Sequence, residues 1–189
     1  MISIDRARRG TGVLAIAIAA LALGGCAVQR AEVDEGFSGE ALAAQGTGAG
    51  IPVQVDGPVG SARGAALAES VTGAMPTEVA GTAVHYVACE PYQECPGDHV
   101  VWTFGPPSAR SSWNYPAAFH FYPGWIGSYE PGPNRVTAKV ALFQGDNVVA
   151  TADGQVDAPN GADDPAFRAM IDQMSRAIFS GPGLLDEFF

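Results

Sequence analysis

Alternating hydrophobic and polar positions predict β-strands through the second part of the chain. The pattern is clearest over 134–143 and 148–156, where every second residue is small or apolar along one face. A Gly-Asp-Asn turn separates these two stretches, so they are predicted to pair as an antiparallel hairpin. Weaker alternation over 82–89 and 99–104 predicts a second hairpin, and 51–55 predicts an earlier strand.

Apolar residues at helical spacing predict two helices, at 62–75 and 164–180. The second helix begins with Pro165, a residue favoured at the first helical position, after Asp163 or Asp164 as the N-cap. Its apolar face consists of Phe167, Met170, Ile171, Met174 and Ile178.

The predicted elements follow the order strand, helix, two strands, two strands and helix, with a further short strand expected at 119–122. This order predicts an α+β fold, in which an antiparallel sheet of about four to six strands carries both helices on one face. Residues 51–189 are long enough to form a single domain with its own hydrophobic core.

A basic segment and a short apolar run open the chain. Arg6, Arg8 and Arg9 precede eleven apolar residues at 13–23, and small residues follow, which is the order typical of a secretory signal peptide. Eleven helical residues span about 16 Å, roughly half of the hydrocarbon core of a bilayer. The run therefore predicts export rather than a transmembrane helix.

The end of this run, Leu23-Gly24-Gly25-Cys26, resembles the lipobox of bacterial lipoproteins. The resemblance implies that the Cys26 thiol carries diacylglycerol, that residues 1–25 are removed as the signal peptide, and that the new amino group is acylated by a fatty acid such as palmitate. Two or three acyl chains give lasting membrane attachment. An aspartate after the cysteine favours the inner membrane in Gram-negative lipoproteins, so Ala27 implies the periplasmic face of the outer membrane.

The residues alone leave two other export signals open. An ordinary signal peptide cut nearby would leave Cys26 as a free or paired thiol. The pair Arg8-Arg9 also occurs in twin-arginine signals, although Gly10-Thr11-Gly12 lacks the apolar residues that usually follow it.

Residues 26–50 combine the lipidated cysteine with an acidic, glycine-rich stretch that has few large apolar side chains. Such a composition predicts a flexible, solvated tether. A flexible stretch of this length spans roughly 25–30 Å, so the domain is expected to stand a short way off the membrane.

The charge of the chain limits its partners. Twenty acidic and ten basic residues give a net charge of −10, and loss of the signal peptide removes three arginines and one aspartate, for a mature charge of about −12. Such a chain lacks the basic surface that nucleic acids require, and anionic head groups would repel it. Membrane attachment is therefore expected to depend on the lipid, with no nucleic acid as a partner.

Two cysteines, Cys89 and Cys95, remain once Cys26 is assigned to the lipid. In an exported protein, two thiols this close in sequence are expected to form a disulfide. Five residues lie between them, which excludes a Cys-x-x-Cys redox motif.

Seven of the 17 residues at 113–129 are aromatic, and prolines and glycines among them exclude a continuous helix. Trp and Tyr join a large apolar body to a polar tip, which suits stacking on sugar rings or docking a protein. The candidate binding surface consists of Trp113, Tyr115, Trp125 and Tyr129. The alternative is that the aromatic residues of this stretch cover the open sheet face or edge as part of the core.

The sequence contains no motif for catalysis, a cofactor or a metal. The three histidines, His85, His99 and His120, lack the spacing of zinc ligands. No Gly-x-Ser-x-Gly, Ser-x-x-Lys or phosphate-binding loop occurs. These observations predict a protein that is not an enzyme and binds neither a cofactor nor a metal.

The sequence thus predicts a membrane-anchored envelope lipoprotein whose domain faces the periplasm and binds or scaffolds another envelope protein or peptidoglycan. The alternatives are an accessory lipoprotein of an envelope transport or export complex, and a small periplasmic hydrolase. The element order over roughly 51–180 also resembles that of the penicillin-binding-protein activators and the amino-terminal domain of TolB. This second resemblance rests on element order alone, so no functional residue is carried over from it.

Overall fold

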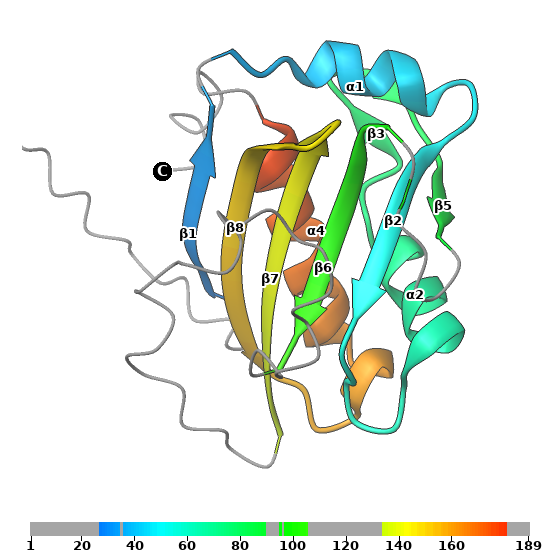
Figure 1. Ribbon diagram of the computed structural model, residues 1–189. Helices are drawn as coiled ribbons and strands as arrows, with labels where there is room; N and C mark the ends of the chain where they lie inside the picture. Colours follow the sequence, from blue (N-terminus) through cyan, green and yellow to red (C-terminus); the bar gives the residue numbers. More distant parts are fainter. Residues whose placement is uncertain (1–26, 35, 90–94, 96, 106–133, 181–189) are drawn as a thin grey trace, which may run out of the picture.

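The structure is a computed structural model that describes residues 27–34, 36–89, 95, 97–105 and 134–180 (Figure 1). A six-stranded mixed sheet forms its centre, in the order β1-β8-β7-β6-β2-β5. The strands are β1 (Ala27–Val33), β2 (Ile51–Asp56), β5 (Tyr86–Ala88), β6 (His99–Phe104), β7 (Arg135–Gln144) and β8 (Asn147–Asp157). The short strand predicted at 119–122 lies outside the described residues.

Three α-helices accompany the sheet: α1 (Gly39–Gly46), α2 (Gly64–Thr72) and α4 (Pro165–Phe179). A two-stranded ribbon, β3 (Glu78–Val79) with β4 (Thr82–Ala83), and the 3₁₀ turn η2 (Gly161–Asp163) complete the described elements. The predicted α+β class is therefore confirmed.

The strands β1, β8, β7 and β6 pair antiparallel. The predicted hairpin of β7 and β8 is confirmed, with Arg135 opposite Asp157 at one end and Gln144 opposite Asn147 at the other. Its register shifts once, after Leu142, where a β-bulge adds a residue to β8.

The strand β2 makes the sheet mixed, because it pairs in parallel with both of its neighbours. Val53 lies opposite Ala88 of β5 on one side and Val100 of β6 on the other. The predicted hairpin of 82–89 with 99–104 is therefore wrong, and so is a purely antiparallel sheet. Alternation identifies extended segments without naming their partners, and β2, whose Ile51 and Val53 are fully buried, takes the place between β5 and β6.

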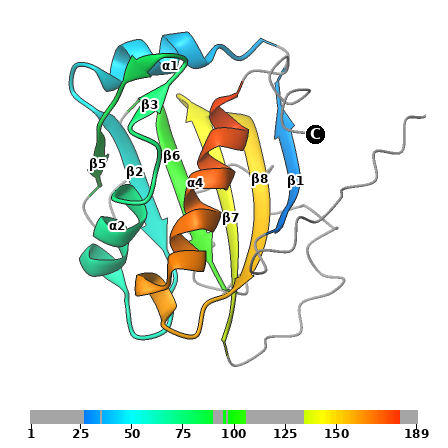
Figure 2. The ribbon, with the colours of Figure 1, turned by 180° about the vertical axis from the view of Figure 1, so that it is seen from behind.

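Both α2 and α4 pack on one face of the sheet, as predicted (Figure 2). The helix α2 is shorter than the predicted 62–75 and ends at a C-cap glycine, Gly73. The N-cap of α4 is Asp164 rather than Asp163, since its carboxylate accepts a hydrogen bond from the Ala166 amide at 2.9 Å.

The core lies between the sheet and these two helices. Trp102 and Phe104 of β6 and Phe167 of α4 are almost completely buried there. The ring centroids of Phe104 and Phe167 are 5.5 Å apart in a tilted arrangement, a favourable aromatic contact.

The flexible tether predicted for 26–50 is wrong where the structure describes this stretch. Ala27–Val33 forms β1, an edge strand hydrogen-bonded along β8. Gly39–Gly46 forms α1, which lies across one end of the sheet and buries Leu42 and Ala43 (Figure 1). Small apolar residues such as Ala31 and Val33 pack against the core. They add little to the average hydrophobicity of the stretch, which is why its composition predicted a tether.

Candidate functional site

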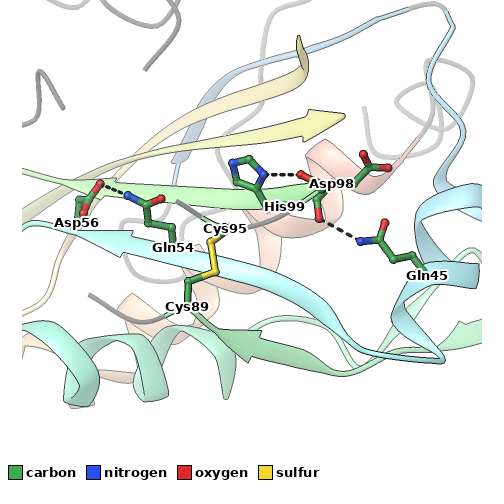
Figure 3. The surroundings of a disulfide bond; sticks show 8 residues. Gln45, Gln54, Asp56, Cys89, Cys95, Asp98 and His99 are labelled. Atoms are coloured by element: carbon green, nitrogen blue, oxygen red, sulfur yellow. Dashed lines mark hydrogen bonds between the residues drawn. A yellow bond between two sulfur atoms is a disulfide. The ribbon is translucent and has the colours of Figure 1, made fainter. Parts of the chain in front are cut away.

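The predicted disulfide between Cys89 and Cys95 is present, with the two Cα atoms 5.8 Å apart (Figure 3). Cys89 follows β5, where its amide donates a hydrogen bond to the Val53 carbonyl at 2.9 Å. Cys95 is buried, in the connection that leads to β6. The bond therefore cross-links the connection between β5 and β6, two strands that lie on opposite sides of β2 in the sheet.

Asp98 links three elements just before β6. Its carbonyl accepts a hydrogen bond from the Gln45 side chain of α1 at 3.1 Å (Figure 3). Its carboxylate accepts another from the Gly145 amide at 3.0 Å. The next residue, His99, stacks on Phe143 with ring centroids 4.8 Å apart and contacts the Gly97 carbonyl through Nδ1. These contacts hold α1, β6 and the β7–β8 turn together and give His99 a structural role.

The structure does not bring the histidines together. His85 precedes β5 and His99 begins β6, with β2 between them, whereas the sequence had placed both in one hairpin. His120 lies outside the described residues. No group of three His, Cys, Asp or Glu side chains suited to a metal ion occurs in the described part of the chain.

Serine hydroxyls of α2 and α4 satisfy their own helices. Ser70, Ser175 and Ser180 each donate a hydrogen bond to the backbone carbonyl four residues earlier, at 3.1, 2.7 and 2.6 Å. A hydroxyl engaged in this way is not aligned with a general base, which nucleophilic catalysis requires.

Tyr86 carries a partly buried, hydrogen-bonded phenol. Its hydroxyl donates a hydrogen bond to the Pro76 carbonyl at 2.7 Å, and its ring stacks on Phe179. Burial raises the pKa of Tyr86 far above its usual value, with a smaller opposing effect from Arg176. The group therefore stays neutral over the physiological range.

The sheet face opposite α2 and α4 carries a polar row that the sequence reasoning did not identify. Four strands contribute one residue each in direct register: Asp56 of β2, Thr103 of β6, Lys139 of β7 and Asp153 of β8. Lys139 and Asp153 lie opposite each other with opposite charges, an arrangement that favours cross-strand attraction. We call these four residues the polar row.

The centre of the polar row is buried. Thr103 is 7% exposed and Lys139 is 6% exposed. The hydroxyls of Thr103 and of Thr137, two residues before Lys139 on β7, have no hydrogen-bond partner among the described residues. Buried hydroxyls of this kind can accept or donate a hydrogen bond and are costly to leave unpaired.

An apolar cluster adjoins the polar row on the same face. Val101, Ala141 and Phe143 are almost fully buried, and Val148 packs against them. The sequence does contain a signal for this cluster. Ala141 and Phe143 continue the face of β7 that begins with polar residues up to Lys139, and a strand face open to water would remain polar there. This second face therefore combines buried apolar and buried polar groups.

One shallow hollow lies between the helices, with an empty volume of about 530 Å³ that includes open solvent. Glu69 and Ser70 of α2, its C-cap Gly73 and Arg168 of α4 line it. One acid and one base in an open hollow do not make an enclosed ligand site, which normally buries most of its ligand.

The other predicted site residues are not placed by the structure. Cys26, the candidate lipid carrier, and Trp113, Tyr115, Trp125 and Tyr129, the candidate binding surface, lie outside the described residues. Among the described helices, none is long and apolar enough to cross a bilayer. No protein-family model, curated protein or solved structure matches this chain significantly.

Proposed function

We propose that this chain is an exported bacterial lipoprotein, held by acyl chains on Cys26, whose folded domain binds or scaffolds another component of the cell envelope. The observation that carries the proposal is the order of basic segment, eleven-residue apolar run and Leu23-Gly24-Gly25-Cys26. Its proposed location is the outer membrane, because the residue that follows the cysteine is Ala27 and not an aspartate.

The disulfide supports export. A bond between Cys89 and Cys95 persists in oxidising compartments, whereas cytosolic thiols are kept reduced. The strongly acidic composition supports a lipid anchor, because this chain would not be drawn to a membrane by charge.

Among the described residues, the side chains that could take part in hydrolysis make contacts within the fold, which favours a binding role. His99 is stacked on Phe143, and the helix serines donate to backbone carbonyls. These side chains make structural contacts. A hydrolase would need such groups free to react, whereas an adaptor or scaffold would not.

Metabolic labelling with a radioactive fatty acid tests the anchor. The wild-type protein should incorporate label and sediment with membranes, and Cys26→Ser should abolish both. The matched control is the double variant Cys89→Ala/Cys95→Ala, which removes the other two cysteines and should keep the label. Label retained by Cys26→Ser would refute the proposal.

Capture after mild membrane solubilisation tests the binding role. Peptidoglycan or a single envelope protein recovered with the wild type supports the proposal as stated. Recovery of transport or export subunits in fixed proportion would instead identify an accessory subunit of such a complex.

A further inference from the structure

The strand β1 begins one residue after the proposed lipid carrier. Ala27, its first residue, lies opposite Gln155 of β8, so the backbone that follows Cys26 is already part of the sheet. Consecutive Cα atoms are about 3.8 Å apart, which leaves no spacer between the lipid and the folded domain. This geometry differs from a tether, which would let the domain rotate and drift.

The register shows which end of the sheet the anchor joins. Ala27 lies at the same end as Arg135, the first residue of β7, and Asp157, the last residue of β8. The end of β2 and the start of α4 lie there as well (Figure 1). We call this the anchor end of the domain.

The opposite end carries the β7–β8 turn at 145–146 and the helix α1, which lies across it (Figure 1). We call it the distal end. The strand β8 is 11 residues long, so the two ends are separated by about 33 Å.

We propose that the anchor end faces the lipid bilayer and that the sheet stands upright on it, so that the distal end projects into the periplasm. This inference rests on the proposed lipidation of Cys26. Its partner is the bilayer surface beneath the protein's own acyl chains. The distal end, with α1 and the β7–β8 turn, is then the part of the domain that other envelope components meet first.

The charges of the anchor end indicate how it sits on the membrane. Asp157 is paired with Arg135 at 3.2 Å, and Asp163 nearby is exposed. Exposed carboxylates oppose insertion among anionic head groups, so the acyl chains, and not charge, supply the affinity for the lipid surface.

Energy transfer to the bilayer tests this orientation. The full lipidated protein is reconstituted in phosphatidylcholine vesicles that contain an acceptor dye on a fraction of the head groups. A donor dye is placed at Pro159→Cys near the anchor end or at Asp146→Cys in the distal turn, both exposed positions. The engineered thiol is the reactive one, because Cys26 is alkylated and Cys89 is bonded to Cys95.

With a dye pair of short transfer range, transfer should be clearly stronger from position 159 than from position 146. Equal transfer from the two positions, or stronger transfer from 146, overturns the orientation. A variant with about 24 Gly and Ser residues inserted between Cys26 and Ala27 is the control, since a flexible spacer reaching roughly 25–30 Å should reduce the difference.

Failure of the inference can be distinguished from failure of the proposed function. A protein that carries no fatty-acid label on Cys26 refutes the lipid anchor itself. A labelled protein whose two positions transfer equally keeps the anchor and refutes the upright orientation.

Discussion

The two faces of the same sheet differ in what they bury: one buries an apolar core, and the other buries polar and apolar groups at its centre only. On β6, Val100, Trp102 and Phe104 point into an apolar core under α2 and α4, while Val101 and Thr103 belong to the opposite face with the polar row. The helix-covered face gains stability from each apolar contact. On the second face, the burial of Thr103 and Lys139 carries a desolvation cost. Burial there therefore contributes less stability per residue, but the polar groups favour one strand register over others.

The largest expected effect is on the helix-covered face. Phe167→Ala removes a fully buried ring that contacts Phe104, and the cavity left behind should lower the free energy of unfolding by about 3–5 kcal/mol. Urea unfolding followed by circular dichroism measures it. Val87→Ala, at a side chain that is 46% exposed, is the matched control and should change stability by less than about 0.5 kcal/mol. A similar loss in both variants would contradict a core centred on this face.

The disulfide should come next in size, and it constrains the chain independently of either face. Cys89→Ala/Cys95→Ala opens a seven-residue loop and should lower the free energy of unfolding by up to about 2.4 kcal/mol. Reduction of the wild type should give the same loss in urea unfolding. No change on reduction would mean that the bond adds no stability to the connection between β5 and β6.

A reciprocal exchange of two residues on β6 tests the second face directly. Thr103→Val removes a buried hydroxyl without a partner among the described residues and should leave stability unchanged or raise it by about 1 kcal/mol. Val101→Thr places a hydroxyl in the apolar cluster and should lower it by about 1–3 kcal/mol. If Thr103→Val is destabilising, the hydroxyl has a hydrogen-bond partner, and the polar row is a hydrogen-bonded network.

The smallest expected effect concerns the entry to α4. Asp164→Ala removes a carboxylate that accepts hydrogen bonds from the Ala166 amide and from the amide and side chain of Asn160, and it should lower the free energy of unfolding by about 1–2 kcal/mol. Asp163→Ala changes the neighbouring exposed carboxylate, which does not cap the helix, and should be nearly neutral. Equal effects from the two aspartates would indicate a general charge effect in place of a specific cap.

The sequence predicted what depends on neighbours along the chain. The β7–β8 hairpin, the α4 helix with its proline and aspartate start, and the Cys89–Cys95 bond were all predictable, since each needs only local periodicity, a turn or a short loop. The lipobox is likewise a local motif. It remains a prediction, because Cys26 is outside the described residues.

The tertiary structure decided what depends on partners far apart in the sequence. Alternation made 82–89 and 99–104 look like a hairpin, yet β2 is inserted between β5 and β6 in parallel, which no local pattern records. The stretch after Cys26 looked like a tether, yet the exposed edge of β8 supplies the hydrogen bonds that make Ala27–Val33 a strand. Every residue except proline carries a backbone donor and acceptor for a strand, so only the assembled sheet could show that the domain begins immediately after the predicted lipid-bearing residue.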